Sequence, residues 1–199
     1  MANYKSVIIG SQEWMKYNLN VRKFRNGEPI PLIRTPDEWV FASENCQPAC
    51  CFFENMWWIG PNYGKLYNWY AVNDPRGLAP EGWHIPTDEE WEKLTGFLGG
   101  EEVAGTKLKS KREWEDPEGT NTSRFNALPG SFRKPDGEFK GVEDDNNWWK
   151  CFGYWWTSDE NDSGSAWERS IRDYNGYVYR EYADKGYGFS VRCHKNKPL

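Results

Sequence analysis

The sequence has few of the aliphatic side chains from which most protein cores are built. Leu, Ile, Val and Phe together are scarce among the 199 residues, a balance that on its own is typical of disordered chains. The chain nevertheless carries 13 Trp, 11 Tyr and 10 Phe, and its formal net charge is only -5. Because each aromatic side chain can bury roughly 150–250 Å², we predict a folded protein with an aromatic-rich core.

Long apolar runs and basic tracts are also missing from the sequence. No segment approaches the roughly 20 apolar residues that a membrane-spanning helix needs, and no apolar signal-peptide core follows residues 1–5. Lys and Arg are dispersed, whereas a surface that follows a phosphate backbone needs clustered positive charge. We therefore expect no nucleic-acid partner, no membrane insertion by this chain and no signal peptide within it.

Catalytic motifs are equally scarce. Of the two histidines, His84 lies among apolar residues before a predicted helix and is interpreted as structural, and His194 directly follows Cys193. Neighbouring side chains on a strand point to opposite faces, so His194 and Cys193 cannot form a nucleophile–base pair through adjacency. Nucleophile-elbow, zinc-protease and phosphate-binding glycine motifs are absent, and no spacing singles out a glycosidase-like pair among the 30 Asp and Glu. We predict that the protein is not an enzyme.

The five cysteines are an odd number for a disulfide framework. A fully reduced set and one or two bridges with a leftover thiol both stay open, including a bridge from Cys50 or Cys51 to a C-terminal cysteine. Cys46, Cys50 and Cys51 lack Cys-x-x-Cys spacing, so a zinc site would need Cys151 or Cys193 to lie nearby. We predict no metal ligands among them.

Acidic segments at 144–147 and 159–162 bear on a possible calcium site. Both contain the carboxylate and amide oxygens that calcium prefers, although Asp and Asn are also ordinary turn residues. We predict no cofactor, with calcium as the alternative.

Two helix starts share a Thr cap followed three residues later by Glu. Residues 35–45 predict a helix of two or three turns that ends near Asn45. Residues 87–100 predict a longer helix, with a capping box between Thr87 and Glu90 and a left-handed stop at Gly99. Its apolar positions fall on one inward face, namely Trp91, Leu94, Phe97 and Leu98. Residues 105–141, rich in Gly, Pro, Asn and charge, predict long irregular loops.

The C-terminal segment has the pattern of antiparallel strands. Segments 166–172, 177–182 and 187–193 are separated by turn signals at 173–176 and 183–186, which predict a three-stranded meander. Tyr177 and Tyr179 then share one face, while Val178 shares the other with Arg180 and Tyr182. Since both faces carry aromatic rings and a small domain has one core, we expect some of these rings at the surface. The alternative is that the 105–141 segment covers them.

Exposed Trp, Tyr and Arg side chains are the usual anchors of binding surfaces. We therefore predict contact with a protein or glycan ligand through this C-terminal region. The candidate contact residues are Trp148, Trp149, Asp173, Tyr174, Tyr177, Tyr179, Arg180, Tyr182 and Tyr187.

Several blocks of sequence, in order, resemble one family, the Fibrobacter succinogenes major paralogous domain. The blocks are residues 63–72, 76–91, 104–109, 125–130, 154–158 and 188–193. The resemblance runs from about Val7 to Cys193, and we treat residues 1–199 as a single domain. It implies an α+β, C-type-lectin-like fold, in which a twisted antiparallel sheet is flanked by two helices and long loops and the terminal strands lie together.

The same resemblance implies a function in binding. Members of the family are often surface-exposed or lipid-anchored proteins of Bacteroidetes, and some look like variable proteins of diversity-generating retroelements, including bacteriophage-encoded ones. In those proteins a C-terminal segment is diversified while the fold is kept. The expectation is a non-enzymatic ligand-binding protein at a cell surface or on a phage particle.

Two features of related folds are missing from this chain. The Glu-Pro-Asn or Gln-Pro-Asn triplet of calcium-dependent sugar-binding lectins is absent, and the catalytic cysteine pair of formylglycine-generating enzymes has no counterpart. The alternatives are a cysteine oxidase similar to those enzymes and a purely structural surface module.

Overall fold

Strands from both ends of the chain join in one small antiparallel sheet. The computed structural model describes residues 4–114, 119–140 and 152–196. The sheet has the order β1-β2-β9-β5. Its strands are β1 (Ser6–Ile9), β2 (Gln12–Met15), β9 (His194–Lys195) and β5 (Trp83–His84). β9 pairs with β2 on one side and with β5 on the other, so the terminal strands lie together as the resemblance implied.

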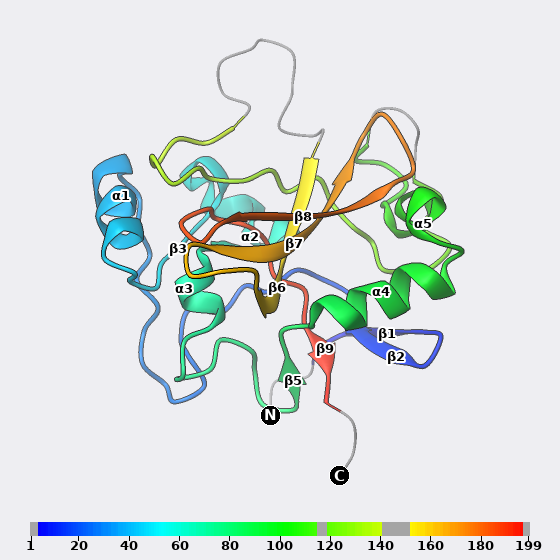
Figure 1. Cartoon of the computed structure of the whole chain (residues 1–199), viewed down its shortest axis with the longest axis horizontal. Helices are drawn as coiled ribbons and strands as arrows, with labels where there is room; N and C mark the ends of the chain where they lie inside the picture. Colours follow the sequence, from blue (N-terminus) through cyan, green and yellow to red (C-terminus); the bar gives the residue numbers. More distant parts are fainter. Residues whose placement is uncertain (1–3, 115–118, 141–151, 197–199) are drawn as a thin grey trace.

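A second sheet is an antiparallel meander at the centre of the molecule (Figure 1). It consists of β6 (Phe152–Glu160), β7 (Ser165–Arg172) and β8 (Val178–Asp184), in that order. Two of the three predicted strands are therefore confirmed, and the prediction that residues 187–193 form the third is wrong.

The segment 187–193 leaves β8 because contacts outside the sheet hold the turn before it. The indole N–H of Trp39 donates to the carbonyl of Gly186 (3.0 Å), and the backbone N–H of Trp69 donates to the carbonyl of Lys185 (2.9 Å). The segment then runs along β6, where Ser190 exchanges backbone hydrogen bonds with Tyr154 and Trp156 at 3.1 Å.

Helices lie on both sides of the meander (Figure 1). The longer ones are α1 (Pro36–Glu44), α4 (Asp88–Phe97) and α5 (Glu101–Leu108). The capping box between Thr87 and Glu90 is confirmed at the start of α4. At α1, Thr35 accepts the backbone N–H of Glu38 (3.3 Å), and its hydroxyl donates to the Glu38 carboxylate (2.8 Å).

Shorter elements connect these helices and strands. They are the strand pair β3 (Cys50–Cys51) and β4 (Leu66–Tyr67), the 3-10 turns η1 (Phe53–Asn55) and η2 (Trp57–Ile59), and the helices α2 (Gly60–Tyr63) and α3 (Trp69–Val72).

Two details of the helix predictions are wrong. Phe97 is 65% exposed, because its ring lies outside the core, over Gly10 in the β1–β2 turn. Residues 105–108 belong to α5 and not to an irregular loop. Ala104 and Leu108 bury one side of α5 in the core, and this tertiary burial outweighs the low helix propensity of Gly105.

The core is aromatic, as the composition predicted. Trp14, Trp91, Phe125 and Trp155 are completely buried, and neighbouring rings among them have centroids 5.1–6.4 Å apart. Aromatic pairs at such separations add to the stabilisation from burial. The core positions α4, α5 and the meander relative to one another, because all three elements contribute side chains to it.

Candidate functional site

The turn between β7 and β8 is held in place by α5, which lies beside it in Figure 1. Gly105 approaches the turn so closely that a Cβ would lie 2.6 Å from the carbonyl oxygens of Gly176 and Tyr177. The buried ammonium group of Lys109 donates to the carbonyls of Asp173 and Asn175, both at 2.8 Å. The backbone of the turn is thus fixed from the side of the core.

The side chains of the turn face outward and contact one another. Tyr174 is 58% exposed and Tyr177 is 40% exposed. The rings of Tyr177 and Tyr179 are stacked with centroids 5.8 Å apart, and the Arg172 guanidinium lies 4.0 Å from the Tyr179 ring. We call Arg172, Asp173, Tyr174, Tyr177 and Tyr179 the turn cluster. The structure brings together four of the predicted contact residues and adds Arg172, which the sequence analysis missed.

Hydrogen bonds order the turn cluster. Arg172 donates to the Tyr174 hydroxyl at 3.2 Å and to the Glu181 carboxylate at 2.8 Å and 3.0 Å. The Asn175 amide donates to the Tyr179 hydroxyl at 2.7 Å. These contacts hold the rings of Tyr174 and Tyr179 in fixed positions.

Arg180 and Tyr182 lie on the other face of the meander, the face that packs on α4. Val178 is buried on that same face, so the predicted division of β8 into two faces is confirmed. The Arg180 guanidinium lies 3.6 Å from the centroid of the Trp167 ring, and Trp167 meets the 61% exposed Tyr182 edge to face. Arg180 and Tyr182 therefore form a second exposed group with Trp167, which the sequence analysis missed.

Arg180 is also part of a buried ion-pair network. Its Nε donates to one oxygen of Asp88 (2.8 Å), while the other oxygen lies 2.5 Å from the fully buried guanidinium of Arg169. Burial lowers the pKa of Arg169, and the Asp88 carboxylate opposes that shift. Asp88 thus ties the start of α4 to β7 and β8, and Arg180 contributes to the fold as well as to the surface.

The remaining predicted residues lie elsewhere. Tyr187 is half-buried, with its ring 5.8 Å from Phe132 and 5.4 Å from Phe189 in the core. Trp148 and Trp149 lie outside the described residues.

A further exposed aromatic pair was not singled out from the sequence. Trp57 and Trp58, in η2, are 68% and 60% exposed, with ring centroids 6.1 Å apart. The only sequence signal was their adjacency within a segment that has no clear periodicity.

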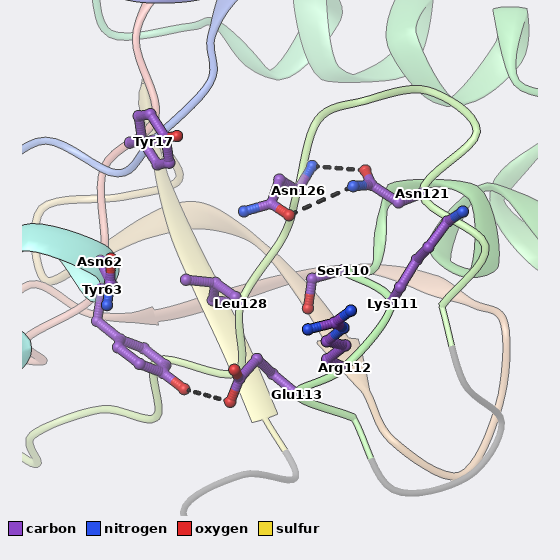
Figure 2. A pocket seen from close by; sticks show the side chains of 10 residues that line it. All are labelled: Tyr17, Asn62, Tyr63, Ser110, Lys111, Arg112, Glu113, Asn121, Asn126 and Leu128. Carbon is purple, nitrogen blue, oxygen red and sulfur yellow. Dashed lines mark hydrogen bonds between the residues drawn. The ribbon is translucent and has the colours of Figure 1, made fainter.

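Figure 2 shows a polar hollow of about 390 Å³ beside α2 and the loops that follow α5. The Tyr63 hydroxyl donates to the Glu113 carboxylate at 3.0 Å, and Asn121 and Asn126 exchange two hydrogen bonds at 3.0 Å and 3.3 Å. Burial raises the pKa of Tyr63, and the nearby Glu113 carboxylate adds to the effect. The Tyr63–Glu113 pair and the Asn121–Asn126 pair in this hollow therefore already hydrogen-bond within the protein.

His84, Glu90 and His194 form the one group of three metal-type ligands found in the described ranges. His84 Nε2 lies 2.8 Å from the Glu90 carboxylate, and His194 Nδ1 lies 3.2 Å from it. The hydrogen bond to Glu90 raises the pKa of His84. Burial alone would raise the pKa of Glu90, but hydrogen bonds from the two histidines outweigh it and lower that pKa. The sequence analysis interpreted His84 as structural but did not identify these partners.

The four described cysteines are free thiols. A disulfide bridge from Cys50 or Cys51 to Cys193, one of the alternatives that the sequence left open, is therefore contradicted. Cys151 lies outside the described residues. Cys50, Cys51 and Cys193 are buried, and burial raises the pKa of each to about 12, whereas Cys46 is exposed. A thiol with so high a pKa is a poor nucleophile at neutral pH.

The acidic segment 159–162 covers the last two residues of β6 and the first two of the turn to β7. One carboxylate oxygen of Asp162 accepts the backbone N–H groups of Gly164 and Ser165, both at 2.8 Å. Glu160 accepts the ammonium group of Lys185. Asp162 and Glu160 thus already have protein partners in this turn, and the second segment, 144–147, lies outside the described residues.

Comparisons with known proteins agree with the resemblance found in the sequence. The family model described as Fibrobacter succinogenes major domain matches residues 7–195. No curated protein and no solved structure matches the chain. Within the part of the chain that the structure covers, none of the helices is long and apolar enough to cross a bilayer. Since the matched residues span nearly the whole sequence, the chain belongs to the Fibrobacter succinogenes major domain family.

Proposed function

We propose that the chain is a ligand-binding protein without enzymatic activity, which contacts a protein or glycan through the turn cluster and Tyr182. One observation carries this proposal. The backbone of residues 173–177 is fixed by Gly105 of α5 and by Lys109, which directly follows α5, while the rings of Tyr174 and Tyr177 face solvent. A fixed backbone with exposed aromatic rings is the arrangement that gives contact area at low entropic cost.

The chemistry of the turn cluster suits a ligand with both apolar and polar surface. Tyrosine presents an apolar ring and a hydroxyl, so it packs against a ligand and hydrogen-bonds with it. Arg172 lies over Tyr179 and pairs with Glu181, which holds its charged guanidinium in a fixed position beside the rings. Proteins and glycans both offer such mixed surfaces.

Two alternatives are weaker. A cysteine oxidase needs a reactive thiolate, but burial raises the pKa of Cys50, Cys51 and Cys193 to about 12. A purely structural surface module would have no reason to keep large rings exposed at a fixed turn.

We extend the proposal to a C-type-lectin-like, diversified binding protein that acts at a cell surface or on a phage particle. The pairing of terminal strands β2 and β9 supports the fold. The backbone of the turn is fixed, whereas its side chains face solvent. This arrangement supports diversification, because exposed side chains can change at little cost to folding. Sequencing the neighbouring genes tests this extension. We expect a reverse transcriptase beside a near-copy of the codons for 145–190, and the absence of both contradicts it.

Binding is tested with the labelled full chain on a glycan array and against a displayed peptide library. The variant Tyr174→Ala/Tyr177→Ala/Tyr182→Ala is compared with Trp57→Ala/Trp58→Ala, which removes the other exposed aromatic pair. We expect the tyrosine variant to lose binding to every hit by at least about tenfold and the tryptophan variant to keep it. The reverse result contradicts the proposed surface, and two blank screens favour the structural module.

A further inference from the structure

His84, Glu90 and His194 project into one small space from rigid elements. His84 in β5 and His194 in β9 lie directly opposite each other in the antiparallel register, so their side chains leave the same face of the sheet. Glu90 is in the first turn of α4, where its carboxylate also accepts the backbone N–H of Thr87 in the capping box. Two paired strands and a capped helix therefore fix the three side chains.

The distances between the side-chain atoms match those expected around a small metal ion. A tetrahedral zinc ion with ligands at about 2.0–2.1 Å has ligand atoms roughly 3.3–3.4 Å apart. His84 Nε2 and His194 Nδ1 are 3.3 Å apart, and His194 Nδ1 is 3.2 Å from a Glu90 oxygen. The distances from His84 Nε2 to the two Glu90 oxygens are 2.8 Å and 3.0 Å. Shifts of a few tenths of an ångström would complete the geometry.

The hydrogen bond between His84 and Asn196 orients the imidazole so that His84 Nε2 points toward this space. The Nδ1 atom of His84 lies 2.8 Å from the side-chain oxygen of Asn196, which can only accept. Nδ1 therefore carries a proton, and in the neutral imidazole Nε2 presents its lone pair to the cluster. This is how neighbouring groups usually orient a metal-binding histidine. The backbone N–H of Asn196 donates to the carbonyl of Gly82 (3.0 Å), so Asn196 is itself held in place.

His194 also presents a nitrogen to the cluster from a buried position. It is only 5% exposed, and its Nε2 has no hydrogen-bond partner. Its polar contacts in the structure are made by Nδ1, with His84 and Glu90. Two imidazole nitrogens and a carboxylate thus converge, and a metal ion could take the place of the protons that join them in these hydrogen bonds.

We propose that His84 Nε2, His194 Nδ1 and the Glu90 carboxylate bind one divalent transition-metal ion of the zinc class, with a fourth position open to water. Two imidazole ligands favour zinc and similar ions over calcium and magnesium. The side chains of His84 and Glu90 are 35% and 20% exposed, which gives water access to the remaining position. The ion would link the start of α4 to the sheet that joins the chain ends, so its binding stabilises the fold. This site is independent of the turn cluster.

Isothermal titration of the full chain with Zn²⁺ tests the proposal. The starting protein carries Cys46→Ser, because Cys46 is an exposed thiol that can bind zinc by itself. We expect one ion per chain and a higher midpoint of thermal unfolding when Zn²⁺ is present. The chain has only two histidines, so NMR should show both imidazoles responding to the same equivalent of metal.

Substitutions of the ligands and of a matched control locate the ion. His84→Gln should weaken Zn²⁺ binding by at least about 100-fold, and Asn196→Ala by roughly 10–100-fold, as expected for loss of an orienting partner. Glu90→Gln should weaken binding similarly while keeping a side chain that can complete the capping box. Glu89→Gln, on the same helix but exposed and paired with Lys93, should have no effect.

Several outcomes would overturn the proposal. They are a failure of Zn²⁺ to bind the Cys46→Ser protein and unchanged affinity when His84→Gln is added to it. The absorption spectrum of bound Co²⁺ is a second readout, and a thiolate charge-transfer band would assign the ion to cysteine. Because His84 is partly exposed, His84→Gln should unfold near the wild-type temperature without metal, so weakened binding in that variant would not reflect unfolding.

Discussion

Gly105 of α5 lies against Gly176 of the β7–β8 turn without room for a single methyl group between them. A Cβ on Gly105 would be 2.6 Å from the Gly176 carbonyl oxygen, and one on Gly176 would overlap Thr106 Oγ1. The backbone of α5 and the backbone of the turn therefore touch directly. This contact separates the turn into a backbone that belongs to the scaffold and side chains that belong to the surface.

Replacing Gly105 by Ala should destabilise the protein, although alanine normally favours a helix. The added Cβ would overlap two backbone carbonyl oxygens, which cannot move as a side-chain end can. We expect the free energy of unfolding to fall by about 1–3 kcal/mol, the usual cost of overpacking. Chemical denaturation measures it.

Gly96→Ala is the matched control for this change. Gly96 lies in α4, and a Cβ added to it would meet nothing within 4 Å beyond its own stretch of helix, so alanine there should raise stability by roughly 0.5–1 kcal/mol. A similar gain from Gly105→Ala would show that α5 does not press on the turn.

Asp88→Asn should be strongly destabilising. The substitution leaves the fully buried guanidinium of Arg169 without its only carboxylate partner within 4 Å in the described part of the chain, and unpairing a buried charge costs about 3–5 kcal/mol. Glu89→Gln, which breaks an exposed ion pair with Lys93, should have little effect on stability because solvent screens that pair. Equal effects of the two substitutions on urea denaturation would contradict the buried network.

Glu168 should make the stability of the protein decrease as the pH rises. The side chain is buried, and burial together with the nearby Glu181 carboxylate raises its pKa well above the usual range. A carboxyl group whose pKa is raised by folding stabilises the native state below its unfolded pKa and loses that contribution as the pH rises.

Glu168→Gln should therefore increase the free energy of unfolding by about 1–3 kcal/mol at pH 8 and have little effect near pH 4. Denaturant titrations at both pH values provide the measurement. If the variant and the wild type lose the same stability between pH 4 and pH 8, a group other than Glu168 causes the pH dependence of stability.

Thiol reactivity should follow burial. In a Cys151→Ser background, we expect one thiol per chain, Cys46, to react quickly with a disulfide reagent under native conditions, because the others are buried with raised pKa values. The remaining three should react only after unfolding. Fast reaction that survives Cys46→Ser would revive the cysteine oxidase alternative.

Local signals allowed the correct prediction of several elements. The Thr87–Glu90 capping box lies within four residues, and the alternation that places Val178 and Tyr179 on opposite faces is a property of one strand. Such features depend on neighbouring residues, so the sequence contains them in full. The aromatic composition likewise predicted the core.

Features that depend on distant contacts could not be predicted. Helix α5 begins directly after two glycines and contains a third, and only its packing on β8 explains why it forms. Residues 187–193 have a strand pattern, but Trp39 and Trp69 divert them to β6. His84 and His194 are 110 residues apart and meet only because β5 pairs with β9.

The central claim is that folding and ligand contact at the β7–β8 turn depend on different groups of atoms. The thermal unfolding midpoint of Tyr174→Ala/Tyr177→Ala/Tyr182→Ala tests it most directly. Because the three rings are exposed, we predict a cooperative transition within about 5 °C of the wild-type midpoint. Loss of the cooperative transition would show that these rings are part of the core and would contradict the claim.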